Sequence, residues 1–441
     1  MEHENSRPAH SYPSEQQKRA ADIWQAIFKL QTSFSEYLYT PMRPSEGEKQ
    51  HQVSNGSETD IIGPPQPRNI TTVLEELEIS PKHIGSDESA NLVSKIRRLL
   101  DNRSLTELIV NTAKHESPDS FVLRYFRARK WEIGRTLCML IAALHWYHFE
   151  ANVEGDILKN GEEVAIRDSE KGICLDPKLA SDFMKQVRMG KSFLHGRDKD
   201  GRPIWYARVR LHRPSDQCNE SIERYTLYLI ENIRLMLTPS TETITIFYDM
   251  TGFSIANMDY NFVKFSTNIF EANYPEILGY ILIHNAPWVF QGIWRLIRGW
   301  LDPVVANKVR FTTGRKGLEK FIAPENLVKE LGGDDDWTYR YEEPISGENE
   351  RLTDAATRDR LLLERETLTK QFVSISNAWL KALDHAELMS NRSIVIGQLR
   401  SNYAKLDPYI RSRSLYDRQG TLVIADVDLS TGNTDEKKAS S

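Results

Sequence analysis

The fold is decided by residues 271–308, which read EANYPEILG at 271–279, YILIHNAPWVF at 280–290 and LDPVVANK at 301–308. The triplet Tyr-Pro-Glu at 274–276 should end a helix, because proline cannot continue one, and the aliphatic run at 280–284 predicts a short buried strand. Asn-Ala-Pro at 285–287 then turns the chain into an aromatic-rich amphipathic helix. An apolar helix that is hinged on prolines and flanked by a carboxylate and a lysine is typical of a lid over an apolar cavity, not of a catalytic centre.

Strand and helix patterns alternate on both sides of this stretch, over residues 175–345. Three further strands are expected: 204–211, whose alternation is typical of an edge strand, 243–248, which is β-branched, and 309–313. A helical pattern covers about 257–272. This alternation predicts an α/β domain with a mostly parallel sheet and crossover connections.

The overall composition excludes several classes of protein. The net charge of −5 gives no global attraction for nucleic acid. Cys138, Cys174 and Cys218 form no CxxC pair, which is typical of reduced residues in a cytoplasmic protein. No apolar run reaches the roughly 18–20 residues of a membrane span. We therefore expect a cytoplasmic, soluble protein that touches membranes only as a peripheral protein.

The chain divides into five predicted parts. These are a largely disordered region at 1–85 with a short amphipathic helix at 17–39, a helical module at 86–150, an α/β domain at 151–345, a helical extension at 346–426 and a disordered tail at 427–441. Within the extension, residues 354–391 form one long helical pattern with an apolar stripe. This helix either packs on the globular domain or binds a partner protein.

Four blocks of sequence resemble one known family. They are FVLRYFRARKW at 121–131, DKDGRP at 198–203, the stretch from 274 to 308, and APENLVKELGG at 323–333. In this order they resemble the CRAL-TRIO family of lipid-transfer proteins, of the yeast phosphatidylinositol/phosphatidylcholine exchange type. The resemblance implies a helical N-terminal cap on a mostly parallel sheet, which floors a lipid pocket closed by a gating helix. It also implies a carrier of single lipids and no enzyme.

The resemblance places a lipid headgroup against Arg129, Lys130 and Lys308, with Glu276 and Asp198 nearby. A guanidinium and two ammonium groups suit a phosphate in a partly desolvated site. The alternative is that the basic pair merely complements the end of a helix. For the two acids, the alternatives are a surface carboxylate and a residue of a hairpin turn.

The resemblance also indicates which lipid the pocket takes. Members that bind phosphatidylcholine carry hydroxyl side chains at the positions of Trp205, Ile244 and Ile246, so we expect weak or no binding of that lipid. Val305 stands where the phosphatidylinositol-binding pattern has threonine, so one hydroxyl contact is missing. We expect phosphatidylinositol with a different second ligand, such as a sterol or another apolar molecule.

His284 is a polar ring in an aliphatic strand, and Tyr248 ends another strand of the pocket lining. One branch of the family binds haem, so these two side chains are a possible ligand pair. A histidine that is hydrogen-bonded in the core is the alternative, and no haem is expected. His145 and His148 have no third ligand in view, so no metal site is predicted.

The gating helix should present aromatic and aliphatic side chains to the pocket and to the membrane. Arg295 and Arg298 would lie towards lipid headgroups, a pattern typical of an interfacial helix; an ordinary core helix is the alternative. The predicted gate and membrane-contact residues are Pro287, Trp288, Phe290, Trp294, Ile297, Trp300 and Leu301.

The sequence thus predicts a phosphatidylinositol-binding protein that exchanges single lipids between membranes, with the bound phospholipid as its ligand and no other cofactor. Two alternatives remain open at this stage. One is a carrier or sensor of a non-phospholipid ligand, a sterol or haem. The other is a scaffold that recruits a partner through the 354–391 helix.

Overall fold

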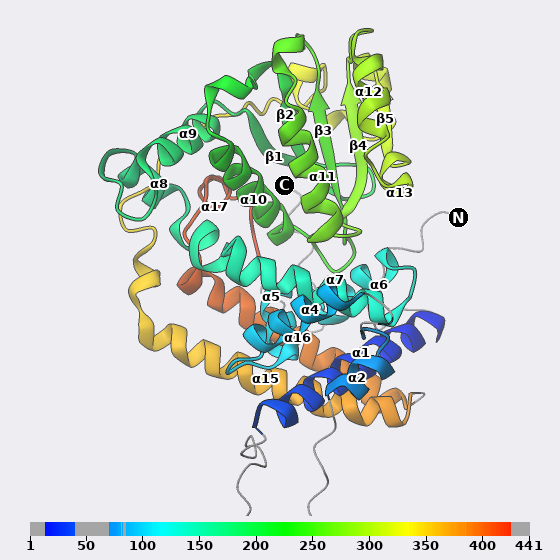
Figure 1. The fold of residues 1–441 in the computed structure, drawn as a ribbon. Coiled ribbons are helices and arrows are strands. Elements are labelled where there is room, and N and C mark those ends of the chain that lie inside the picture. Colours follow the sequence, from blue (N-terminus) through cyan, green and yellow to red (C-terminus); the bar gives the residue numbers. More distant parts are fainter. Residues whose placement is uncertain (1–13, 40–69, 81, 83–84, 384, 425–441) are drawn as a thin grey trace, which may run out of the picture.

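The computed structural model describes residues 14–39, 70–80, 82, 85–383 and 385–424. An α/β domain lies above a set of helices from both ends of the chain (Figure 1). No helix among these residues is long and apolar enough to cross a membrane. The predicted disordered segments at 41–67 and 427–441 lie outside the described residues.

The domain is built on one sheet with the strand order β1-β2-β3-β4-β5, in which β1 is antiparallel to β2 and the other pairs are parallel. The mostly parallel α/β fold is therefore confirmed. The edge position predicted for 204–211 is wrong, because β2 lies between β1 and β3 and ends at Arg208. The strands are β1 Ser192–Arg197, β2 Pro203–Arg208, β3 Ile244–Asp249, β4 Leu278–His284 and β5 Val309–Thr312.

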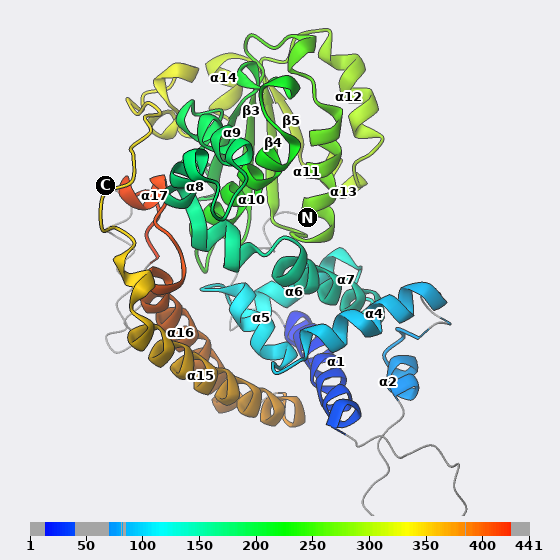
Figure 2. The ribbon, with the colours of Figure 1, turned by 60° about the vertical axis from the view of Figure 1, so that its left-hand side comes forward.

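Helices cover both faces of the sheet. On one face Ile244 and Ile246 of β3 pack with helices α10 (Asn219–Leu235) and α11 (Tyr260–Ala272). On the other face Phe247 packs with Leu318, the last residue of α14 (Gly314–Leu318). Helices α8 (Lys159–Lys171) and α9 (Pro177–Arg188) lie beside α10 (Figure 2).

The lid, predicted as one amphipathic helix after Asn-Ala-Pro at 285–287, consists of two helices. Helix α12 spans Phe290–Arg298, and α13 spans Pro303–Ala306. The break falls where Asp302 caps the second helix and accepts a hydrogen bond from the N–H of Val304 at 2.7 Å. Proline at the first position of α13 suits such a start, because its missing N–H would have no helical partner there.

The N-terminal helix packs into the core. Helix α1 (Ser14–Tyr39) buries Ile23, Trp24 and Ile27 completely, and the indole N–H of Trp24 donates to Asp119 at 2.7 Å. Its apolar face is therefore not available for a membrane. The other helices of this cap are α2 Ile70–Glu76, α4 Ser86–Leu99, α5 Leu105–Ala113, α6 Pro118–Ala128 and α7 Ile133–His145.

The long helix predicted at 354–391 is wrong, because the chain folds there into a hairpin of α15 (Ala355–Lys381) and α16 (Ala386–Ile410). The two helices lie side by side, next to α5 and α1 of the cap (Figure 2). Arg392 of α16 pairs with the buried Asp119, and Arg365 of α15 donates to the carbonyl of Val110 at 2.8 Å. Much of the apolar stripe of the extension is thus buried, with Leu368, Phe372 and Trp379 in the same core as the cap, as the first of the two alternatives expected.

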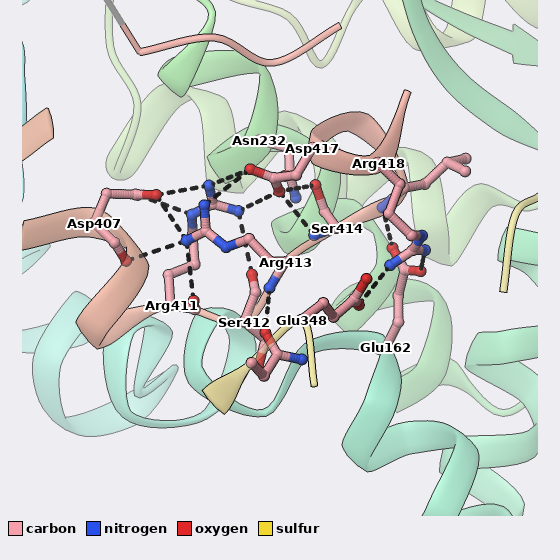
Figure 3. A network of polar contacts seen from close by, with 12 residues as sticks. Glu162, Asn232, Glu348, Asp407, Arg411, Ser412, Arg413, Ser414, Asp417 and Arg418 are labelled. Carbon is pink, nitrogen blue, oxygen red and sulfur yellow. Dashed lines mark hydrogen bonds and ion pairs between the residues drawn. The ribbon is translucent and has the colours of Figure 1, made fainter. Parts of the chain in front are cut away.

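A polar network fastens the end of the described chain to the α/β domain (Figure 3). Glu162 of α8 is fully buried and pairs with Arg418 of α17 (Leu415–Arg418). Arg411 spans Asp407 at 2.9 Å and Asp417 at 2.7 Å. Charges buried in this way must all be paired, so the network fixes the hairpin relative to the domain.

A second buried cluster joins the cap to the α/β domain. Glu231 of α10 is 0% exposed and pairs with Lys114 at the end of α5. It also accepts hydrogen bonds from Arg234 at 3.0 Å and from the hydroxyl of Tyr274 at 2.7 Å. Burial alone would raise the pKa of Glu231, but Arg234 and Lys114 lower it to about 2, so the carboxylate stays charged.

We predict that Glu231→Gln destabilises the protein by about 3–5 kcal/mol, because it leaves the buried Lys114 without its counter-charge. Urea unfolding followed by circular dichroism measures the change. Glu220→Gln, at an exposed position of the same helix, is the matched control and should change stability by less than about 0.5 kcal/mol. Equal stability of the two variants would contradict the role given to this cluster.

Candidate functional site

An apolar cavity of about 210 Å³ lies between the sheet and helices α10, α11 and α12. The floor is formed by every second residue of the central strands. Examples are Trp205 and Ala207 of β2, and Ile246 and Tyr248 of β3. Because side chains alternate along a strand, one face of the sheet supplies the whole floor.

The walls and the roof follow helical spacing. Residues 222, 225, 226 and 229 of α10 line one side, and residues 263, 266, 267 and 270 of α11 line another. Spacings of three and four place such residues on one face of a helix. Each helix thus turns a single stripe towards the cavity, and in Figure 1 α11 lies near β3 and α12 near β5.

Four of the predicted gate residues line the cavity, and these four share one face of the gating helix. The other three do not: Trp288 is 84% exposed before the start of α12, and Trp300 lies against Tyr260 and Lys264. Pro287 precedes the helix and is partly exposed. The four lining residues are Phe290, Trp294, Ile297 and Leu301.

Three of the five predicted pocket-lining residues, Trp205, Ile246 and Tyr248, border the cavity. Ile244 is buried at the start of β3, outside the lining. His284 lies on the opposite face of the sheet, where its Nδ1 is 3.0 Å from the hydroxyl of Thr312. Tyr248 and His284 therefore do not face a common ligand, and this pair is not a haem site.

Lys308 and Glu276 meet at the amino ends of the strands. Their charged atoms are 3.5 Å apart, and both side chains are partly exposed. Lys308 lies between Val305 and Val309, which line the cavity. Glu276 adopts a φ of 57°, a conformation that non-glycine residues rarely adopt and that is concentrated at functional sites.

Arg129 and Lys130 follow the end of α6, where Lys130 has a φ of 52° and is exposed. One turn earlier, the hydroxyl of Tyr125 donates to the carbonyl of Asn273 at 2.9 Å. This end of α6 therefore lies beside the segment that leads to Glu276. Within the described residues, neither Arg129 nor Lys130 forms an ion pair with Glu276.

Asp198 has a different position from the one expected. Its buried carboxylate accepts hydrogen bonds from the hydroxyl of Thr245 at 2.6 Å and from the backbone N–H of Arg202 at 2.9 Å. It also pairs with the Arg202 guanidinium at 3.2 Å. Asp198 thus holds the turn before β2 and does not line the cavity.

These elements match one family. The model of the CRAL/TRIO domain matches residues 187–333. A CRAL-TRIO domain-containing protein of Schizosaccharomyces pombe is 40% identical over 331 residues, which cover 75% of this chain and 71% of the relative. The chain belongs to the CRAL-TRIO family.

Two further relatives carry other names. The phosphatidylinositol transfer protein CSR1 of Eremothecium gossypii is 40% identical over 329 residues, covering 74% of this chain and 73% of the relative. The Sec14 cytosolic factor of Schizosaccharomyces pombe is 26% identical over 272 residues, covering 57% and 84%.

No pattern in the sequence indicates the polar group at the other end of this cavity. Lys191, His212 and Asp259 line it there, and Nε2 of His212 lies 3.2 Å from Oδ2 of Asp259. They come from three separate loops, so no spacing along the chain links them. Among the described residues no group of histidine, cysteine and carboxylate side chains could hold a metal ion.

We predict that Thr267→Trp lowers uptake of the apolar probe diphenylhexatriene about tenfold, because the indole fills space between α11 and the sheet. Fluorescence titration measures the uptake, and circular dichroism checks the fold. Asn268→Trp adds the same ring at the adjacent, exposed position of α11 and should leave uptake unchanged. Normal uptake by Thr267→Trp would show that the probe binds elsewhere.

Proposed function

We propose that this protein binds single phosphatidylinositol molecules in the cavity and exchanges them between membranes, without catalysing a reaction. The observation that carries the proposal is the apolar cavity with the Lys308–Glu276 pair beside it. The name of the Eremothecium gossypii relative, a phosphatidylinositol transfer protein, supports the same ligand.

The energetics explain why such a carrier is needed. Each methylene exposed to water costs about 0.8 kcal/mol, so two bare acyl chains of roughly 30 methylenes cost on the order of 20 kcal/mol. The apolar walls of the cavity would take the place of the bilayer around these chains. We place the route of entry at a wall that can move outward.

Helix α12 is the wall suited to move. Phe290 and Ile297 pack in an apolar cluster with Met250 and Ile283, and Trp294 packs on Phe311. Within the described chain, no side chain of α12 forms a hydrogen bond or an ion pair. Outward movement of α12 therefore breaks only apolar side-chain contacts, and contacts with the acyl chains of the lipid replace them.

The outer surface of the gate suits a membrane. Trp288 and Leu296 are exposed apolar side chains, and Arg295 and Arg298 are exposed cations beside them. This combination is typical of helices that bind at the interface of a bilayer. These side chains support transient binding to membrane surfaces through α12 and Trp288, and we propose that the protein acts from the cytoplasm.

At the headgroup, the Lys308 ammonium would exchange its contact with Glu276 for the phosphate of the lipid. Arg129 and Lys130 would approach from the end of α6. A phosphodiester can accept charge-assisted hydrogen bonds from several of these cations at once, whereas the ion pair with Glu276 engages Lys308. The release of Glu276 would couple headgroup binding to the segment that enters β4.

We predict that Arg129→Ala combined with Lys308→Ala lowers phosphatidylinositol transfer between vesicles about 100-fold, because each charge-assisted hydrogen bond contributes about 1.5–3 kcal/mol. The fold should be intact, since both side chains are partly exposed. Lys316→Ala with Lys320→Ala removes the same charge from the exposed region around α14 and is the control. Normal transfer by the first double variant would refute the headgroup site.

A separate prediction concerns the membrane. Trp288→Ala should weaken binding to phospholipid vesicles about tenfold, because burial of a large apolar side chain contributes about 1.5–3 kcal/mol. Co-sedimentation with vesicles measures the affinity. Ile173→Ala removes another exposed apolar side chain, between α8 and α9 on the far side of the domain (Figure 1), and should have no effect. Equal losses in both variants would contradict a membrane contact at the gate.

A further inference from the structure

The cavity has a second polar end, opposite the Lys308–Glu276 pair. The carbonyl of Lys191 accepts a hydrogen bond from the N–H of Arg208, the last residue of β2, at 2.9 Å. Lys191 therefore lies at the carboxyl ends of the parallel strands. Lys308 precedes β5 and lies at their amino ends. A ligand group at Lys191 is thus distinct from the headgroup proposed at Lys308.

Lys191 is a buried cation without an anionic partner. The residue is 6% exposed and lines the cavity. Its ammonium donates to Oε1 of Gln217 at 2.8 Å and to Oε1 of Gln186 at 3.2 Å, and both acceptors are neutral. An ammonium has three N–H donors, and among the described residues no carboxylate lies within 4.0 Å of it. One donor is thus left for a ligand, and no carboxylate of the described residues is in direct contact with the charge.

The two amides are fixed in place. Nε2 of Gln186 donates to the hydroxyl of Ser221 at 3.0 Å, and Nε2 of Gln217 donates to the carbonyl of Arg213 at 2.9 Å. Because both amide nitrogens donate hydrogen bonds elsewhere, the amide oxygens are the atoms that face the ammonium of Lys191. Burial lowers the pKa of Lys191 to about 8, against the opposing effect of Asp216, so the amine is mostly charged at neutral pH.

Tyr248 supplies a second donor at the same end. It lines the cavity and pairs in register with Ala207, which in turn pairs with Ser192, the neighbour of Lys191. Within the described part of the chain, its hydroxyl has no hydrogen-bond partner. Burial raises the pKa of Tyr248 to about 12, so the phenol keeps its proton and can donate it to an anion.

The neighbouring acid does not neutralise Lys191. Asp259 caps α11, with one oxygen 2.9 Å from the N–H of Phe262 and the other 3.2 Å from Nε2 of His212. Burial, reinforced by the charge of Lys191, lowers the pKa of His212, which keeps the imidazole neutral. The positive charge at this end of the cavity is therefore carried by Lys191, and the negative charge of Asp259 is held by its two hydrogen bonds to Phe262 and His212.

We propose that this end of the cavity binds the carboxylate of a long-chain fatty acid, held by the Lys191 ammonium and the Tyr248 hydroxyl, with the hydrocarbon chain against the apolar walls. A single buried cation and a phenol match a monoanion with two oxygens. The protein then carries a single-chain anionic lipid as an alternative to the phospholipid proposed above. This ligand requires neither Lys308 nor Glu276.

The test compares oleate with oleyl alcohol, which has the same chain and no charge, by displacement of a fluorescent fatty acid from the full-length protein. The wild-type protein should bind oleate about tenfold or more tightly than the alcohol, because hydrogen bonds to charged groups are the stronger ones. Lys191→Met should remove this preference and Tyr248→Phe should reduce it, whereas Lys191→Arg should preserve most of it.

Two controls separate this inference from the proposed function. Tyr280→Phe removes a hydroxyl on the opposite face of the neighbouring strand and should leave the preference unchanged. Lys308→Ala should weaken phosphatidylinositol transfer while oleate binding stays normal. Equal affinity of the wild-type protein for oleate and oleyl alcohol, or an undiminished preference in Lys191→Met, would overturn the carboxylate site and leave the phospholipid function standing.

Discussion

The buried carboxylate of Glu231 is the interaction on which the arrangement of the site depends. It pairs with Lys114 of the cap and accepts hydrogen bonds from Arg234 of its own helix and from the hydroxyl of Tyr274 in the segment before β4. A carboxylate in this position would be costly if any partner were missing. Cap, α10 and the entry to β4 are therefore fixed together. Glu276 lies two residues beyond Tyr274, so the same cluster positions the acid that faces Lys308.

The gating helix α12, unlike the cap, is held by apolar contacts and, in the described part of the chain, not by buried ion pairs. The cap is fixed by Glu231, and the C-terminal hairpin is fixed by Glu162, Arg411 and Arg418 (Figure 3). Helix α12, by contrast, rests on apolar contacts. Directional ion pairs in the interior hold one geometry, whereas non-directional apolar contacts are exchanged readily for lipid chains. This difference divides the molecule into a fixed frame and a movable wall, as exchange of a lipid requires.

Much of the α/β fold could be predicted from the sequence, because β-branched and aliphatic runs mark the buried strands directly. The strand predicted at 280–284 is β4, Leu278–His284, and the one at 243–248 is β3, Ile244–Asp249. What failed depends on contacts between distant residues. The inner position of β2 requires β1, whose sequence SFLHGR shows no clear alternation. The turn between α15 and α16 contains neither glycine nor proline at residues 382–385.

The same limit applies to the site. The spacing of Phe290, Trp294, Ile297 and Leu301 in the sequence predicts one face of a helix, and all four line the cavity. The face occupied by His284 depends on its register with Asp249 across two strands, which no single strand reveals. Lys191 is an isolated lysine in the sequence. Its significance comes from burial and from two glutamines on other elements.

The central claim is that the cavity carries one lipid at a time. The most direct test is a mass-spectrometric inventory of the lipids that remain bound to the purified protein after incubation with vesicles of mixed composition. The account predicts phosphatidylinositol at about one molecule per chain. Protein that recovers no lipid, or that recovers only lipids lacking an inositol headgroup, would contradict it.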